Sequence, residues 1–393
     1  MKDLCACWSS PAQTQTRRLV PRRDGMKQAT WHIQKQVDRA LGKLVEKGVV
    51  KERAPNATYD CVAVLQVLFC AAMLRTFVES AVSRMRNVWN RIVPDADTVF
   101  RRLKENGKAS LMALISFNRE MVGAAKRKGW FRKRVVVAID MWDREYYGKQ
   151  RDVNCSTGKE KNGTRYFHRV ATLAVVEEGK RLEVAMMSVS LFAPKQRIVH
   201  ALLVEALRFI RIKVVLLDRG FNSHAVIRTI EALNLRYIMP MTKNRRVKRE
   251  IAQTSGLWYR VVENYRFRLN SHLETTLIIL DVKLLDKKAA RDSYLTYITN
   301  FHVYNAKESV MAVAHFYESR WGIETGYRVK KWEFRAKTCS ESTMVRFFFI
   351  LLAIILFNIW TLMRFANPIR HKNGVPAYIL TEAYLQMIRA SSA

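Results

Sequence analysis

The sequence predicts an α/β fold: a mixed β-sheet flanked by helices, with an N-terminal helical domain before it and a β-rich insertion within it. Three observations support this prediction. Residues 26–130 show helical apolar periodicity, short all-apolar runs follow, and period-two alternation appears within residues 241–305. A chain of 393 residues is long enough for such a multi-part fold with a substantial core.

Basic residues outnumber acidic ones by two to one, with 68 Lys and Arg against 34 Asp and Glu and a formal charge of +34. Because the chain is also 49% hydrophobic, this excess does not indicate disorder, which combines high charge with low hydrophobicity. A folded protein with so basic a surface is expected to bind a polyanion, and nucleic acid is the first candidate. An anionic membrane surface is the alternative. A merely soluble basic protein is disfavoured, since solubility needs a net charge of only about 2–8.

The six cysteines and the N-terminus give little sign of a metal site or of secretion. No Cys-x-x-Cys spacing occurs, and no His-x3–5-His pair accompanies Cys5 and Cys7, so a zinc site is not expected. Residues 1–25 have no apolar stretch of the length of a signal peptide, and we expect them to form a flexible basic leader. These features fit a reducing, intracellular compartment.

Residues 26–130 are expected to form a helical domain that contacts DNA. An amphipathic stretch over 27–48 precedes a longer apolar-periodic one over about 60–89. Asp97 is then a credible N-cap for a short helix that presents Arg101 and Arg102 in its first two turns. We interpret this helix as a possible recognition helix, with both arginines on DNA. The alternative is a plain bundle helix with solvated arginines.

Residues 131–240 are expected to form the first part of the mixed sheet. The expected strands are 135–139, 166–176, 181–189, 213–217 and 237–240, with helices over 199–210 and 223–234. The first and fourth strands are each followed directly by an aspartate, Asp140 and Asp218. The order βββαβαβ, with acids at two strand ends, is that of an RNase H-like sheet.

The sheet pattern is interrupted at residues 241–305. The segment 265–269 alternates with period two, a turn follows at 270–272, and strands are expected over 276–284 and 294–299. Helicity returns near Ser309. We therefore expect a β-rich insertion over 241–305 and the second part of the sheet domain, with its helices, over 306–393.

A helix over 317–331 would gather an unusual set of side chains on one stripe. With about 100° per residue, the side chains of one acid, two cations and a phenol fall within an arc of about 60°, and two more lie close beside it. The stripe comprises Tyr317, Arg320, Glu324 and Lys331, flanked by Trp321 and Arg328. The alternative is an exposed face with ion pairs worth about 0.2–0.5 kcal/mol each. The two aromatic residues, which a solvated face does not need, favour a functional stripe.

Glu324 supplies a third acid to Asp140 and Asp218. Three carboxylates that converge from two strand ends and a helix could hold two Mg²⁺ ions, with Mn²⁺ as a substitute. Such ions, about 3.5–4 Å apart, promote in-line phosphoryl displacement. The other residues of the stripe would then contact the DNA. Arg320 and Lys331 would bind phosphates, Tyr317 would donate a hydrogen bond to a phosphate, and Trp321 would stack on an unpaired base.

The spacing Tyr-x2-Arg-x3-Glu-x6-Lys over residues 317–331 resembles the signature of IS4-type insertion-sequence transposases. Segments 139–149 and 217–223 are similar to the two aspartate segments of its ISH3-like branch. The resemblance covers about residues 133–364. It implies an RNase H-like DDE transposase with a β insertion, which cleaves transposon ends with Mg²⁺ and transfers the strands into target DNA by cut-and-paste.

The resemblance also implies partners and a location. Double-stranded DNA would bind as terminal inverted repeats and as target, with a homodimer assembled on the DNA. The protein would be located in the cytoplasm of a prokaryote, associated with the nucleoid. Two alternatives stay open: an RNase H-like nuclease or resolvase, and an inactive DNA-binding derivative.

Several neighbouring features compete with these assignments. Asp140 is preferred over Asp143 and Glu145 because it directly follows the buried strand. His168 and His224 are interpreted as structural or phosphate-contacting.

Two basic runs and one apolar run complete the prediction. Residues 126–134 and 243–249 are dense in cations, and phosphate contact is expected from the second run through Lys243, Arg245 and Arg246. Residues 347–363 form an apolar run of 17 residues, shorter than the roughly 20 that a membrane span needs and flanked by arginines. A buried core helix is favoured over a membrane span, and no membrane partner is expected.

Overall fold

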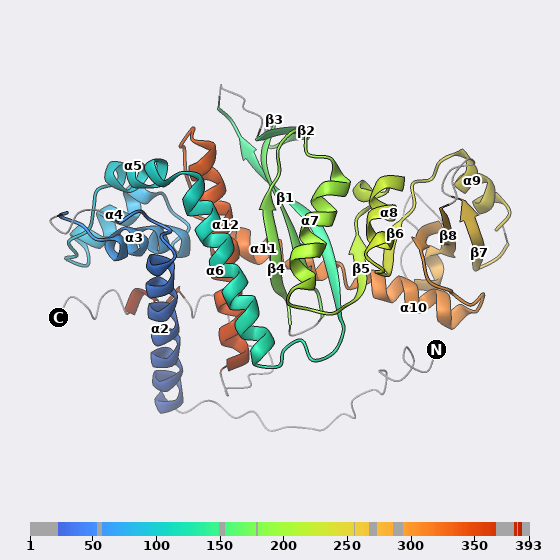
Figure 1. The fold of residues 1–393 in the computed structure, drawn as a ribbon, viewed down its shortest axis with the longest axis horizontal. Coiled ribbons are helices and arrows are strands. Elements are labelled where there is room, and N and C mark those ends of the chain that lie inside the picture. The colour runs from blue at the N-terminus through green and yellow to red at the C-terminus, as the bar shows by residue number, and fades with distance from the viewer. Residues whose placement is uncertain are drawn as a thin grey trace.

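Figure 1 shows the computed structural model, which describes residues 23–52, 57–148, 154–177, 180–254, 256–266, 273–285, 294–366, 381–382 and 384–386. Most of the expected basic leader, residues 1–22, lies outside these ranges. The first described element is α2 (Arg23–Glu46). It begins a group of helices that leads into the sheet, in agreement with the predicted order of helices before strands (Figure 1).

Within the described residues, nine strands form one mixed sheet. Eight of them follow the order β2-β3-β1-β5-β6-β9-β8-β7, and the ninth, β4, pairs with β3 along a different part of that strand from β2. β1 runs antiparallel to β3 and parallel to β5, which is parallel to β6. This arrangement is the predicted RNase H-like sheet. The strands are β1 (Val135–Tyr146), β2 (Cys155–Lys161), β3 (Thr164–Val175), β4 (Leu182–Ser188), β5 (Ile212–Leu217), β6 (Tyr237–Pro240), β7 (Tyr259–Arg266), β8 (Glu274–Asp281) and β9 (Tyr294–Thr299).

The segment expected as an insertion extends the same sheet. β9 pairs antiparallel with β6, and β8 and β7 follow it outward. The helix α9 (Arg245–Ala252) precedes these strands and coincides with the basic run that the sequence left unassigned to an element. The segment therefore widens the sheet beyond β6, and its strands do not form a separate sheet.

The first strand is longer than predicted. The apolar run ends at Ile139, where the parallel pairing with β5 also ends (Ile139↔Leu217), but β1 continues to Tyr146 along β3. Polar residues hid this extension, because only one face of that part of the strand is buried. The polar strand β2 was missed because only its first two residues are buried and the other five are exposed and mostly polar.

Helices cover both faces of the sheet. α7 (Lys195–Leu207) and α8 (His224–Ala232) pack on the face that receives the odd-numbered side chains of β1, such as Val137 and Ile139. α10 (Lys307–Glu318) and α11 (Trp321–Glu333) lie on the other face, toward which Val136 and Ala138 point. Because side chains alternate along a strand, Asp140 points to the face of α10 and α11.

The N-terminal helices are α2, α3 (Cys61–Met73), α4 (Val78–Asn87), α5 (Ala96–Asn106) and α6 (Lys108–Arg127). The apolar stretch predicted as one element is split into α3 and α4, which meet at 110°. Arg75 in the bend has a positive φ of 54°, a conformation that ends a helix. The N-cap of α5 is Asp95, which accepts a 2.7 Å bond from the Thr98 amide, and the predicted cap Asp97 lies inside the first turn.

The apolar run near the C-terminus forms α12 (Thr343–Ala366). It packs beside α6 and joins the N-terminal helices to the sheet in one continuous core (Figure 1). Among the described residues it is the one helix that alone is long and apolar enough to cross a membrane, over Thr343–Arg364. Its most apolar window is 94% buried inside the fold, so α12 is a core helix, as predicted.

Candidate active site

The three predicted acids meet around a single guanidinium, that of Arg320. Arg320 Nη2 lies 2.6 Å from Glu324 Oε1, and Nη1 lies 3.8 Å from Asp140 Oδ2. Asp218 is also within electrostatic range of both Arg320 and Asp140. Side chains from three distant parts of the sequence thus share one location, where the pairing of β1 with β5 ends.

The sheet register explains why the two aspartates are neighbours. The parallel pairing of β1 and β5 ends at Ile139↔Leu217, so Asp140 and Asp218 are the next residues on adjacent strands. The Met141 amide donates a 2.7 Å hydrogen bond to Asp140 Oδ1. Asp218 leaves the sheet at the start of a short 3-10 turn and is exposed.

The predicted helical stripe is divided between two helices. α10 ends at Glu318 and α11 begins at Trp321, and the amides of Arg320 and Ile323 bond to carbonyls three residues back. The single helix expected over 317–331 is therefore wrong, and Tyr317 belongs to the earlier helix. Tyr317 still contacts the site, because the Arg320 guanidinium lies 5.5 Å from the centre of its ring.

A glycine allows α11 to approach the sheet closely where it begins. A Cβ atom on Gly322 would lie 3.1 Å from the Val176 carbonyl oxygen, tighter than an ordinary contact. The first turn of α11, which carries Glu324, is thereby held close to the end of β3.

The electrostatics of the site favour a bound cation. Burial raises the pKa of Asp140 to about 6; the Met141 amide and Arg320 act in the opposite direction, and the Asp218 and Glu324 carboxylates raise it further. Burial also raises the pKa of the Tyr317 hydroxyl, so that group stays protonated at neutral pH and can donate a hydrogen bond.

The donor set suits Mg²⁺, which prefers carboxylate oxygens. In the described part of the chain, however, no three acid, histidine or cysteine side chains are close enough together to hold a metal ion. The reason is visible at Arg320, whose guanidinium supplies the positive charge between Asp140 and Glu324. Its Nε is buried without a hydrogen-bond partner, so the acids do not fully satisfy the guanidinium. Asp140, Asp218 and Glu324 are the residues that would hold a divalent ion in place of the guanidinium.

The other members of the predicted stripe surround the acids at different depths. Trp321 is 56% exposed at the start of α11, and Arg328 is exposed one helical turn beyond Glu324. Lys331 is half-buried and interacts electrostatically with Glu145 of β1.

Arg102 has a structural position, in contrast to its predicted DNA contact. It is only 2% exposed and donates hydrogen bonds to the carbonyls of Lys51, Tyr59 and Asp60. A side chain buried in this way inside the N-terminal helices cannot reach DNA without unfolding them. Arg101 is exposed and pairs with Glu105 at 3.5 Å.

The basic run of α9 is partly engaged with the protein. Arg245 is exposed, and Lys243 just before the helix is half-buried. Arg246 donates to the Arg266 carbonyl at 2.9 Å and lies 5.2 Å from the centre of the Tyr265 ring.

The competing side chains have protein partners. Arg169 donates two hydrogen bonds, of 2.6 and 2.9 Å, to the Asp143 carboxylate. Both oxygens of that acid are therefore already engaged, which argues against Asp143 as a metal ligand. The His168 ring is buried against Tyr146 and Phe347.

Sequence reasoning missed a set of interacting polar side chains behind Glu324, three of them buried and one, Tyr327, partly buried: Thr172, Glu183, Tyr327 and Lys330. Lys330 is fully buried and ion-paired with Glu183. The sequence gives no signal for such a pair, because charged residues are normally expected at the surface.

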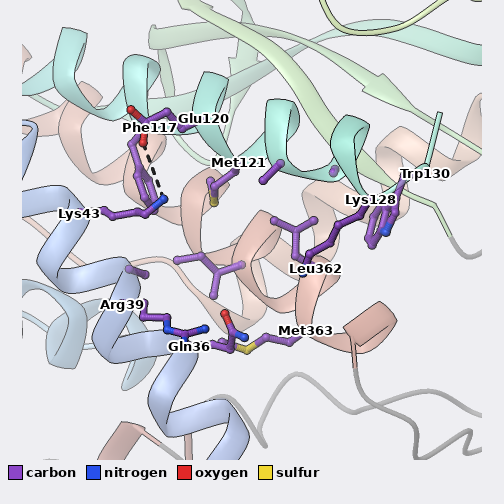
Figure 2. Close-up of a pocket in the computed structure, with 14 residues that line it drawn as sticks. Gln36, Arg39, Lys43, Phe117, Glu120, Met121, Lys128, Trp130, Leu362 and Met363 are labelled. Carbon is purple, nitrogen blue, oxygen red and sulfur yellow. Dashed lines mark ion pairs between the residues drawn. The ribbon is translucent and has the colours of Figure 1, made fainter.

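A pocket of about 470 Å³ lies elsewhere, between α2, α6 and α12 (Figure 2). Its walls are largely apolar, with Phe117, Met121 and Leu362, and Lys43 pairs with Glu120 across one side at 4.0 Å. None of the three acids lines it, so it is not the candidate active site.

Comparisons with known proteins identify the family of the chain and a similar fold. The family described as "Transposase DDE domain" matches residues 133–358, which include all three acids. The fold is similar to that of a piggyBac transposase, solved by cryo-electron microscopy as a synaptic complex with hairpin DNA. The TM-score is 0.57 at 11% identity, and the similarity covers 92% of this chain and 81% of the other. No curated protein sequence matches the chain. The family match spans more than half of the chain and the RNase H-like transposase fold accompanies it, so the protein belongs to the Transposase DDE domain family.

Proposed function

We propose that this protein is a cut-and-paste DNA transposase of the IS4 type, in its ISH3-like branch. Asp140, Asp218 and Glu324 would hold two Mg²⁺ ions for cleavage at transposon ends and strand transfer into target DNA. The observation that carries the proposal is the meeting of these three acids, from β1, β5 and α11, around one guanidinium. The family to which the chain belongs is defined by such a DDE domain.

The arrangement of the side chains supports a division of roles. When bound, the ions would activate the attacking water or 3′-hydroxyl and stabilise the leaving oxygen. Arg320, once released from the acids, is placed to bind a phosphate next to the scissile bond, and its planar fork suits bidentate contact. Tyr317 can donate a hydrogen bond to a phosphate from the same corner. The exposed ring of Trp321 can stack on an unpaired base.

Double-stranded DNA is the proposed partner, as terminal repeats and as target. The net charge of +34 supports this, and so does the exposure of Arg101, Arg245 and Arg328. The similar piggyBac structure is a synaptic complex with hairpin DNA. By analogy, we propose that this chain joins two ends as a homodimer assembled on the DNA.

The test uses linear DNA that carries the element's own ends, incubated with the full chain and Mg²⁺ or Mn²⁺, with strand breaks mapped to the nucleotide. Asp140→Asn, Asp218→Asn and Glu324→Gln should each abolish cleavage and leave DNA binding measurable. Glu318→Gln is the matched control, because this acid ends α10 and pairs with His315 at 3.3 Å.

Retained cleavage in any one of the three variants would remove that residue from the proposed site. Cleavage at branched DNA without strand transfer would favour the alternative, an RNase H-like nuclease or resolvase. Binding without cleavage in the unaltered chain, with either metal, would favour an inactive DNA-binding derivative.

A further inference from the structure

A pair of hydroxyl groups joins the strand layer of Asp140 to the helix of Glu324. Thr172 on β3 stands directly opposite Asp140 in the antiparallel register. Its Oγ1 lies 2.7 Å from the hydroxyl of Tyr327, which follows Glu324 by three residues on α11. The helix that carries Glu324 is therefore in direct polar contact with β3, the strand that pairs with β1 at Asp140.

The Tyr327 ring makes two further contacts. The Trp142 ring from β1 stacks on it, with centres 5.9 Å apart and planes 23° from parallel. Lys330 Nζ lies 4.3 Å from the centre of the same ring, within cation–π range. These contacts restrict the Tyr327 ring. If α11 rotated or shifted, the Tyr327 hydroxyl could therefore not move to keep its hydrogen bond with Thr172.

A buried ion pair fixes the next turn of α11. Lys330 Nζ donates to Glu183 Oε1 of β4, and both side chains are almost fully removed from solvent. Burying two charges is costly unless their geometry is well kept, so rotation of α11 that separates them is strongly opposed. The pair therefore defines a preferred angle of α11 on the sheet.

Close packing fixes the height of α11 above the sheet. A Cβ on Gly326 would lie 3.5 Å from Phe357 and 3.8 Å from both Glu183 Oε1 and Lys330 Nζ. Gly322, Gly326 and Lys330 are spaced four residues apart and so share one face of the helix. The closest approach of this face to the sheet is at Gly322, where an added Cβ would lie 3.1 Å from the Val176 carbonyl oxygen, whereas at Gly326 it would make only ordinary contacts.

Glu183, the partner of Lys330 in this ion pair, is itself held in place by hydrogen bonds. Asn358 of α12 accepts from the Glu183 amide at 3.0 Å and donates to the Glu183 carbonyl at 2.8 Å. Asn358 also donates to Asn118 of α6 at 2.7 Å. Glu183 is thereby tied through its backbone to two core helices, which makes it a fixed reference for Lys330.

We propose that Tyr327 and Lys330 are positioning residues that set the rotation and height of α11, and so place Glu324 opposite Asp140 for metal binding. The inference rests on the proposed function, because it concerns the placement of a proposed metal ligand. Neither residue touches the ion or the DNA; each acts through Glu324.

The test removes single hydroxyl groups at constant shape. Tyr327→Phe and Thr172→Val each break the hydroxyl pair, and Thr172→Ser is the matched control that keeps it. For each protein, the Mn²⁺ concentration that gives half-maximal cleavage is measured at saturating DNA, together with the maximal rate. Direct Mn²⁺ binding by electron paramagnetic resonance and the melting temperature are measured in parallel.

We expect Tyr327→Phe and Thr172→Val to raise the half-maximal Mn²⁺ concentration about 3- to 10-fold and to weaken direct binding equally, about 1 kcal/mol per fivefold change. Thr172→Ser should behave as the unaltered chain, and the double variant should be no worse than either single one. A lower melting temperature with unchanged Mn²⁺ dependence would show a merely structural role and overturn the proposal. If the unaltered chain binds no Mn²⁺ and cleaves no DNA, the proposed function fails, and the inference that rests on it fails with it.

Discussion

Replacing Lys330 should destabilise the whole protein far more than an ordinary surface lysine would. Lys330→Met keeps most of the side-chain volume but leaves the Glu183 carboxylate buried without its counter-charge. Both side chains are almost fully buried, 0% and 1% exposed, so solvent screening does little to reduce the effect. Removing one partner of such a pair costs about 3–5 kcal/mol, a large part of the roughly 5–15 kcal/mol that holds a protein folded.

The double variant Lys330→Met/Glu183→Leu separates the ion pair from its surroundings. It removes both charges, and the contacts of Asn358 survive because they use only the backbone of Glu183. Replacing a buried ion pair by apolar groups of similar volume is often neutral. We therefore expect the double variant to lose about 1 kcal/mol or less, well below the sum of the two single changes.

Urea unfolding followed by tryptophan fluorescence measures the free energy of unfolding of each protein. The slope of this free energy against urea concentration should be the same for all variants, which shows that they unfold in the same way. A cost below about 1 kcal/mol for Lys330→Met would refute the reasoning, because it would mean that the Glu183 charge is not confined in a dry interior. Single costs that simply add in the double variant would refute it as well, since they would show no coupling between the two residues.

Three further predictions concern charged side chains elsewhere. Arg320→Gln should strengthen Mn²⁺ binding to the DNA-free protein several-fold in a paramagnetic-resonance titration, because the guanidinium no longer competes for the acids; weaker binding would contradict this. Arg102→Met should lower the free energy of unfolding by about 3 kcal/mol or more, since three carbonyls lose their donor, whereas Arg101→Met should change it by less than about 0.5 kcal/mol. Arg245→Gln should reduce the log–log salt slope of DNA binding by about 0.9, the value for one phosphate contact, and an unchanged slope would exclude that contact.

The sheet and the acids were predictable because apolar runs carry a strong signal. A strand buried on both faces is continuously apolar, so the ends of the runs before Asp140 and Asp218 mark the end of the buried pairing. The polar continuation of β1 and the polar strand β2 escaped the same criterion. The continuation of β1 pairs with residues of β3 that lie further along the chain, which local composition does not reveal. β2 forms a tight hairpin with β3, but its Gly, Glu and Lys residues are ones that strands usually disfavour.

The candidate site was predictable in its members but not in its local geometry. The spacing of Tyr317, Arg320 and Glu324 pointed to one stripe, yet the chain breaks its helix between the first two. Helical spacing alone cannot reveal such a break, because Ser319 and Arg320 are not strong helix breakers. Likewise, only packing distinguishes Arg102, which serves the core, from the exposed Arg101 beside it.

The helix α12 has a consequence for how the protein is made. The apolar faces of α2 to α6 are completed by residues of α12, which leaves the ribosome long after them. During synthesis the apolar faces of these helices would stay exposed to solvent until residues 343–366 have emerged from the ribosome. Exposed apolar surface of this kind is prone to aggregation and is what chaperones bind. A chain that ends before that segment would leave the apolar faces of its N-terminal helices exposed to solvent, and we expect it not to fold stably.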